Sequence, residues 1–168
     1  MGGMPKYPHR GSTGSVSRYI ALPPEAIYAV ISNVALIPKW SPECDKVELT
    51  QPGQPITVGT EFIGHNHDPY MQWSTTCRVE VIEPNRKFSF RIIKGVFLAR
   101  TRWTYQLVPQ KGGTLVTESY EIIRANPWPI RQITMRKRHD SDTERPKKLL
   151  NNMAVSLANL ETYLLGNN

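Results

Sequence analysis

The central part of the chain alternates between hydrophobic and polar residues with a period of two, which is typical of β-strands with one buried face. Short turns rich in Pro, Gly, Asn and Asp separate the alternating stretches. A first strand is expected at 15–21, before any helical pattern. The strands predicted after it cover residues 45–50, 60–67, 72–83, 87–93, 99–109 and 114–123. Because the turns are short and hold no helix, these six strands must pair antiparallel.

Helical periodicity flanks this region on both sides. Pro23 and Pro24 indicate the start of a first short helix, because proline is tolerated in the first helical turn. A second short helix is expected at 34–40. Near the C-terminus, hydrophobic residues recur at spacings of three and four, which predicts an amphipathic helix beginning at Pro146. Its hydrophobic positions are Leu149, Met153, Leu157, Leu160 and Leu164.

This order of elements predicts an α+β fold: a bent, seven-stranded antiparallel sheet, two short helices, and a long C-terminal helix that the sheet grips. Several short motifs occur along the chain, at or near these predicted elements. They are LPPE at 22–25, WSPEC at 40–44, FIGHN at 62–66, WST at 73–75, EP at 83–84 and GGT at 112–114. Together they make the chain similar to the SRPBCC or START-like superfamily of helix-grip proteins, and to its bacterial polyketide cyclase/dehydrase and lipid-transport members. The resemblance implies a ligand held inside the fold.

Length and composition set the domain organisation. Residues 1–14 are rich in Gly, Pro and Ser and are predicted to be a flexible arm, whereas 15–165 are expected to form a single START-like ligand-binding domain. Hydrophobic residues make up 39% of the chain, which excludes a disordered polypeptide. No apolar run approaches the ~18–20 residues of a membrane span. With only Cys44 and Cys77 and no signal-peptide pattern, a cytoplasmic location is expected.

Alternation divides the predicted sheet into two faces, because residues i and i+2 of a strand point to the same side. The face toward the C-terminal helix mixes aromatic residues with an asparagine and a glutamate, which a filled core would not favour. Its members are Phe62, Gly64, Asn66, Trp73, Thr75, Cys77, Val79, Val81, Phe88, Phe90, Ile92, Trp103, Tyr105, Leu107, Val116, Glu118, Tyr120 and Ile122. Since buried polar groups need partners or water, this face predicts a cavity with aromatic walls. A closed core with internally satisfied polar groups is the alternative.

The cavity predicts binding of a hydrophobic or aromatic small molecule, either a lipid or a polyketide-like compound. The candidate ligand-binding residues are Trp40, Phe62, Asn66, Trp73, Phe88, Phe90, Trp103, Tyr105, Glu118 and Tyr120. A polyketide cyclase or dehydratase is the alternative function for the same cavity, with Glu118 and Tyr105 as candidate catalytic residues that move protons. Burial would raise the pKa of an inward-facing glutamate. Glu118 equally fits a structural acceptor, and the aromatic residues equally fit simple packing.

No metal or cofactor is expected. His65 and His67 share one face of a predicted strand, with Asp68 following, and two imidazoles so placed can bind a metal. Alternation points both histidines away from the cavity, however, and no further ligand lies at a suitable spacing. The cysteines form no CxxC pair, and Cys77 is expected to be an inert core thiol.

The positive charge of the chain is concentrated in one segment. The formal net charge is +7, and the basic connector 124–148 carries eight basic and three acidic residues. We interpret this connector as a solvated lid over the cavity mouth. An anionic membrane surface is the alternative partner, because Trp128 and Ile130 accompany the basic residues. Nucleic acid is not expected, since no recognised binding motif accompanies the charge.

Overall fold

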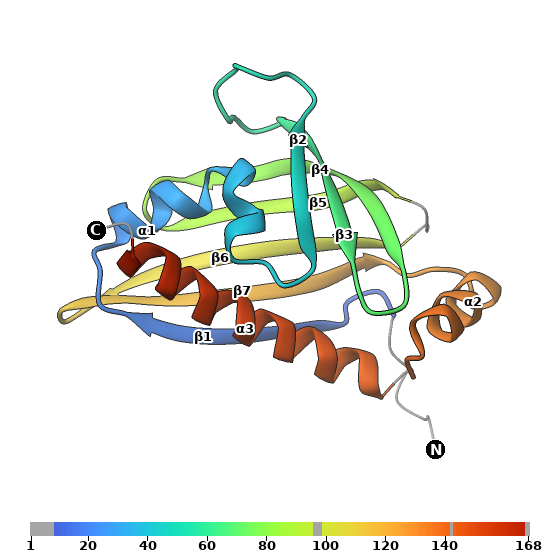
Figure 1. Cartoon of the computed structure of the whole chain (residues 1–168). Coiled ribbons are helices and arrows are strands. Elements are labelled where there is room, and N and C mark those ends of the chain that lie inside the picture. Colours follow the sequence, from blue (N-terminus) through green and yellow to red (C-terminus); the bar gives the residue numbers. More distant parts are fainter. Residues whose placement is uncertain (1–8, 96–98, 142, 167–168) are drawn as a thin grey trace.

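The computed structural model describes residues 9–95, 99–141 and 143–166 (Figure 1). The described residues form one seven-stranded antiparallel sheet in the order β1-β7-β6-β5-β4-β3-β2. The elements are β1 (Thr13–Ile20), α1 (Pro24–Ile31), the 3₁₀ helix η1 (Val34–Lys39), β2 (Cys44–Leu49), β3 (Glu61–His67), β4 (Gln72–Glu83), β5 (Lys87–Gly95), β6 (Arg100–Gln110), β7 (Gly113–Arg124), α2 (Trp128–Arg138) and α3 (Glu144–Gly166). This architecture confirms the predicted α+β helix-grip fold.

The sheet curves around α3, which crosses its inner face (Figure 1). Strands β2 to β7 follow one another as a meander, and β1 pairs antiparallel with β7 at the other edge, from Thr13 opposite Glu121 to Ile20 opposite Thr114. Helix α1 and η1 lie at one end of the sheet. Helix α2 follows β7 and lies at the opposite end, so the two ends of the fold are covered by different elements.

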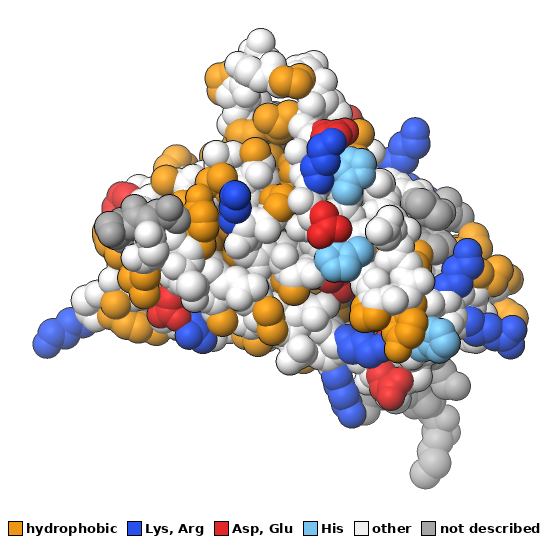
Figure 2. Space-filling view, viewed as in Figure 1, with side chains coloured by type: hydrophobic (Ala, Val, Ile, Leu, Met, Phe, Trp, Pro, Cys, Tyr) orange, Lys and Arg blue, Asp and Glu red, His pale blue; other side chains and the backbone are white. Residues whose placement is uncertain are grey.

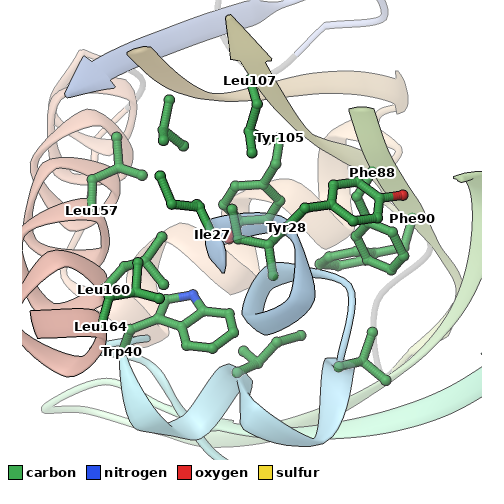
Figure 3. Packing of buried hydrophobic residues seen from close by; sticks show 14 of the residues in the cluster. Ile27, Tyr28, Trp40, Phe88, Phe90, Tyr105, Leu107, Leu157, Leu160 and Leu164 are labelled. Atoms are coloured by element: carbon green, nitrogen blue, oxygen red, sulfur yellow. The ribbon is translucent and has the colours of Figure 1, made fainter. Parts of the chain in front are cut away.

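The hydrophobic core is densest at the α1 end. There the C-terminal half of α3 buries Leu157, Leu160 and Leu164 next to Trp40, which follows η1 (Figure 3). Burying each such leucine stabilises the fold by roughly 1.5–3 kcal/mol. The N-terminal half of α3 makes a smaller second cluster, in which Leu149 packs with Tyr120. Thus the two halves of one helix contact different parts of the sheet.

Helix α3 begins at Glu144, two residues earlier than the sequence predicts. The backbone N–H of Glu144 donates to Ser141 Oγ at 3.1 Å, and this hydroxyl donates to the Glu144 carboxylate, also at 3.1 Å. The first of these contacts satisfies one of the N–H groups that a helix start leaves without partners. Pro146 lies inside the first turn, where its missing N–H is not needed.

The structure changes three other boundaries or orientations. Strand β1 begins at Thr13 rather than at residue 15, and the Gly11 N–H already donates to the Ile122 carbonyl at 2.8 Å. Residues 1–8 of the predicted arm lie outside the described residues. The basic connector holds a helix, α2, that the sequence did not predict. Finally, the pairing of β4 with β5 shifts between Val79 and Val81, so Val81 lies opposite Ser89 on the outer face, contrary to the alternation.

Candidate functional site

A cavity of about 270 Å³ lies between the sheet and the N-terminal half of α3, and side chains of α2 line its far end. Its volume is close to the lower limit of roughly 300 Å³ for small-molecule pockets. Most of the wall is apolar. The apolar residues that line it include Ile37, Val47, Phe62, Trp73, Phe90, Ile92, Trp103, Ile122, Met135, Leu149 and Met153.

Small and polar residues leave the cavity unfilled. On α3, Asn152 and Ser156 face it, where the other half of the helix presents leucines to the core. On the sheet, Gly64 and Thr75 are cross-strand partners and both line the cavity. A Cβ placed on Gly64 would meet its nearest neighbour, the Asn66 amide, at 3.6 Å, which is ordinary contact. The sheet therefore accommodates a Cβ at position 64, where the sequence provides none.

The structure brings seven of the ten candidate ligand-binding residues to the cavity. These are Phe62, Asn66, Trp73, Phe90, Trp103, Tyr105 and Glu118. The structure places the other three in packed regions. Trp40 and Phe88 belong to the core at the α1 end, and Tyr120 packs against Leu149 and Met153. Alternation shows which face a residue occupies, but not which end of that face is filled.

Glu118 and Tyr105 form a buried hydrogen-bonded pair in the wall of the cavity. They are cross-strand partners on β7 and β6, and the Tyr105 hydroxyl donates to Glu118 Oε1 at 3.1 Å. Glu118 is only 5% exposed, and its Oε2 has no hydrogen-bond partner among the described residues. Burial raises the pKa of Glu118 to about 8, with the Tyr105 hydrogen bond as the opposing influence. Burial, and then the nearby Glu118 charge, raise the pKa of Tyr105 well above its ordinary value.

These pKa shifts define the chemistry of the pair. At neutral pH the Glu118 carboxyl is mostly protonated, because its pKa lies above 7. A neutral carboxylic acid donates one hydrogen bond and accepts others. The pair can therefore orient a carbonyl or hydroxyl group of a molecule in the cavity.

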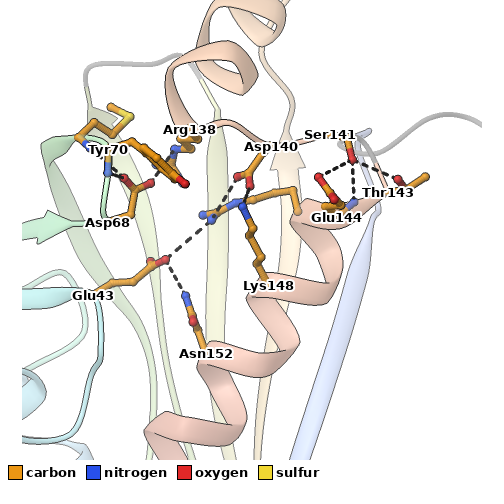
Figure 4. A network of polar contacts seen from close by, with 12 residues as sticks. Glu43, Asp68, Tyr70, Arg138, Asp140, Ser141, Thr143, Glu144, Lys148 and Asn152 are labelled. Carbon is orange, nitrogen blue, oxygen red and sulfur yellow. Dashed lines mark hydrogen bonds and ion pairs between the residues drawn. The ribbon is translucent and has the colours of Figure 1, made fainter.

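At the α2 end the cavity is lined by arginines. Arg131 and Arg138 come from α2, and Arg145 comes from the first turn of α3. The Arg138 guanidinium lies over the Trp73 ring, 4.1 Å from its centroid. Arg145 Nη1 lies 3.8 Å from both Glu43 Oε1 and Asp140 Oδ2 (Figure 4).

Sequence reasoning missed these arginines as cavity residues, because it treated 124–148 as a solvated lid. A signal was present in the sequence. Arg131, Thr134, Met135 and Arg138 follow one another at helical spacings of three, one and three, and all four line the cavity. The two prolines near the start of α2 and its predominantly polar sequence conceal this face from a search for hydrophobic stripes.

The two histidines of β3 lie beside acidic and hydroxyl side chains, and Cys77 is buried. His67 Nδ1 pairs with Asp45 Oδ2 at 2.9 Å, and His65 contacts Ser74 and Glu48. Across the part of the chain that the structure describes, no group of three or more His, Cys, Asp or Glu residues could hold a metal ion. Burial raises the pKa of Cys77 to about 12, so this thiol stays protonated at neutral pH.

Solved structures with the same fold come from distant proteins. TTHA0849 from Thermus thermophilus has a TM-score of 0.73 at 20% sequence identity, covering 94% of this chain and 99% of that one. The major latex-like protein 151 of Panax ginseng has a TM-score of 0.71 at 13% identity, again covering 94% and 99%. XoxI from Bacillus cereus has a TM-score of 0.64 at 20% identity, covering 92% and 96%. Identities this low show a common fold alone.

Sequence comparison identifies the family. No curated protein matches this chain. The sequence profile of the family described as polyketide cyclase / dehydrase and lipid transport matches residues 13–164, which span β1 to the last turn of α3. The match covers the cavity and all the elements around it. The chain therefore belongs to the polyketide cyclase / dehydrase and lipid transport family, of the SRPBCC type that its motifs predict.

Proposed function

We propose that the protein binds a hydrophobic or aromatic small molecule, either a lipid or a polyketide-like compound, in the cavity between the sheet and α3. The observation that carries this proposal is the cavity of about 270 Å³, whose walls are largely apolar and contain one buried carboxyl–hydroxyl pair. Apolar walls favour a ligand by removing its surface from water, at about 25 cal/mol per Å². The few polar groups then fix its orientation.

Two further observations support this proposal. The family description includes lipid transport and polyketide chemistry, both of which involve hydrophobic molecules. The apolar surface that a ligand needs also includes two indoles, those of Trp73 and Trp103, which both line the cavity.

The proposed location of the protein is the cytoplasm, as the sequence predicts. Both cysteines are free and buried, which accords with this location.

A variant that fills the cavity tests the proposal. Gly64→Val adds a β-branched side chain to a strand position where a Cβ meets its nearest neighbour at 3.6 Å, an ordinary contact distance that requires no shift of the backbone. We expect native mass spectrometry of the purified wild-type protein to show a bound hydrophobic compound. In Gly64→Val its occupancy, and the affinity for added naphthalene derivatives, should fall about tenfold or more, which is about 1.4 kcal/mol.

The matched control adds bulk on the other side of the same sheet. Thr76→Ile lies on β4, one residue from the cavity-lining Thr75, and alternation directs its side chain outward. It should retain the wild-type affinity. A wild-type protein that carries no compound and binds no naphthalene derivative would refute ligand binding in this cavity.

Catalysis on a polyketide-like substrate is the second candidate function, and the Glu118–Tyr105 pair is the observation that favours it. In a dehydration, the ionised form of Glu118, which is the minor form at neutral pH because the pKa is about 8, takes the proton α to a carbonyl and leaves an enolate. The same proton then passes to the β-hydroxyl group, which leaves as water while the C=C bond forms. The Tyr105 hydroxyl holds Glu118 in place. Glu118→Gln should abolish turnover of a β-hydroxy ketone substrate but retain its binding, and undiminished turnover would refute this role.

A further inference from the structure

The arginines at the α2 end of the cavity have not been explained by the proposed binding of an apolar ligand. We define the arginine cluster as Arg131, Arg138 and Arg145. All three side chains line the cavity, although they come from two different helices. A cavity that served only to enclose hydrocarbon would gain nothing from cationic walls, because charges in an apolar space are costly.

Arg138 is the most buried member of the arginine cluster. Its side chain is 9% exposed, and one face of the guanidinium is covered by the Trp73 ring at 4.1 Å. Its Nε lies 3.9 Å from Asp68 Oδ2, which is beyond hydrogen-bond distance. In the described part of the chain, this Nε has no hydrogen-bond partner. A buried cation is therefore held in position by stacking while retaining an unused donor.

The neighbouring carboxylates are engaged by other residues. Glu43 Oε1 accepts a hydrogen bond from Asn152 Nδ2 at 2.7 Å, and Asp140 pairs with Lys148 (Figure 4). Arg145 reaches both carboxylates only at 3.8 Å. Arg138 and Arg145 are thus close enough to acids to be oriented by them, but the contacts are too long to be hydrogen bonds.

Electrostatic evidence agrees with this geometry. Burial lowers the pKa of Arg138, and the nearby Arg145 lowers it further. Both influences mean that the charged form is less stable here than in water. An anion placed between the two guanidinium groups would reverse the second effect and supply the missing hydrogen bonds.

We infer that the arginine cluster binds the carboxylate of an acidic hydrophobic ligand, whose apolar body lies against Trp73 and Trp103. This inference rests on the proposed function and names the class of ligand. A planar carboxylate matches the two-pronged geometry of guanidinium groups.

The inference also assigns a direction to the ligand. Arg131 and Arg138 belong to α2, whereas the Glu118–Tyr105 pair lies on the central strands β6 and β7. The carboxylate would therefore lie toward α2, and an uncharged carbonyl or hydroxyl group would lie at Glu118. The buried Glu118–Tyr105 pair carries no cation, so a carboxylate placed there would lose its hydration without gaining an opposite charge, whereas the arginines at the α2 end supply one.

A pair of isosteric probes tests the inference. We would measure the binding of 2-naphthoic acid, which is anionic at pH 7.5, and of 2-naphthamide, which is neutral, by isothermal titration calorimetry. Wild-type protein should bind the acid about tenfold more tightly or better. In Arg138→Gln the affinity for the acid should fall about tenfold, as expected for the loss of a charge-assisted hydrogen bond, and the affinity for the amide should change about twofold or less.

Arg136→Gln is the matched control, because it removes the same charge from an exposed position on the same helix. It should leave both affinities unchanged. If Arg138→Gln does not fold, as judged by circular dichroism, Arg131→Gln provides the same comparison. The inference would be overturned if the wild type bound acid and amide equally. It would also be overturned if the preference for the acid survived Arg138→Gln (or Arg131→Gln in its place), or if 1-naphthyl phosphate bound more tightly than the acid. Each of these results would leave the proposed function standing. If neither naphthalene probe binds, the inference is overturned, and if the purified protein also carries no bound compound, the proposed function fails with it.

Discussion

Glu118 is a buried carboxyl group in the wall of the cavity that lowers the stability of the folded protein. Its carboxyl is buried with a single hydrogen bond from Tyr105, and its pKa is raised to about 8 from an ordinary value of 4.5. A buried carboxyl with one partner costs more than an apolar residue of the same size would. Perturbed carboxyl groups of this kind cluster at functional sites, which agrees with the role that we propose for Glu118.

The raised pKa of Glu118 has a consequence for stability. Below pH 4.5 both the folded and the unfolded protein hold the proton. As pH rises from 4.5 to about 8, the unfolded chain releases it and the folded protein retains it, so the free energy of unfolding falls. The total loss is up to about 5 kcal/mol, at 1.36 kcal/mol per unit of pKa. Urea unfolding between pH 4.5 and 8.5 should show this loss.

Glu118→Gln is the control that isolates this effect, because glutamine has similar size and no proton to lose. Other titrating groups contribute equally to both proteins, so the difference between the two pH profiles reports Glu118 alone. We expect the variant to gain stability relative to the wild type as pH rises. Parallel profiles for the two proteins would show that Glu118 titrates normally in the folded state.

At the scale of elements, α3 combines two functions in one helix. Its C-terminal half presents Leu157, Leu160 and Leu164 to the core, while its N-terminal half presents Asn152 and Ser156 to the cavity. The division lies near Ser156 and Leu157, close to the middle of the helix. The C-terminal half of α3 therefore stabilises the packing of the helix on the sheet, and the N-terminal half leaves the cavity between helix and sheet unfilled.

Leucine truncations should distinguish the two halves of α3. Leu160 is fully buried in the main core, whereas Leu149 lines the cavity and already lacks neighbours on one side. Truncation of Leu160 to alanine should cost about 3–5 kcal/mol, because it opens a new void in close-packed surroundings. Truncation of Leu149 should cost about 2 kcal/mol, because it only enlarges an existing space. Urea unfolding of both variants measures the difference.

A further comparison separates packing from ligand effects. Addition of 2-naphthoic acid should stabilise the Leu160→Ala variant as it stabilises the wild type, since that substitution is remote from the cavity. Equal costs for the two truncations would show that the cavity end is as tightly packed as the core end. That result would contradict the division of α3.

The sequence could predict the elements that follow from periodicity. Alternation located all seven strands and the face toward α3, and the spacing of leucines located α3 itself. It could not predict the shift between Val79 and Val81, because a bulge depends on how two strands pair and not on either strand alone. It also missed α2, whose inward face is Arg131, Thr134, Met135 and Arg138 rather than a hydrophobic stripe.

The periodicity of the strands also predicted part of the candidate site. Glu118 and Tyr105 could be placed on the inner face by alternation, and the structure adds that they are cross-strand partners. The exclusion of Trp40 and Phe88 from the cavity depends on where α1 and η1 pack, which no strand pattern contains. Arg145 reaches the cavity only because α3 begins at Glu144, earlier than its hydrophobic stripe indicates.

At the scale of the whole molecule, the inner and outer faces of α2 differ in character. The inner face lines the cavity, while Ile133 (54% exposed), Arg136 and Lys137 face solvent, as does Trp128 (67% exposed) at the start of the helix. Figure 2 shows basic and hydrophobic side chains together at this end of the molecule. Within the described residues, no helix has the length and hydropathy to cross a bilayer. A surface of this kind suits contact with a membrane surface, because cations attract anionic headgroups while the aromatic ring enters the interface.

We therefore expect the protein to co-sediment with vesicles that contain phosphatidylserine, but not with vesicles of phosphatidylcholine alone. Each of Arg136 and Lys137 contributes roughly 1 kcal/mol near an anionic surface, so their replacement by glutamate should weaken binding by at least about tenfold. Trp128→Ala should weaken it independently of salt, whereas the contribution of the basic residues should fall as salt rises. The matched control, Lys111→Glu, changes a basic residue between β6 and β7, far along the sheet from α2, and should bind as the wild type does. Equal sedimentation with neutral and anionic vesicles, or none with either, would exclude an anionic membrane as the partner of α2 and leave its inner face as the functional one.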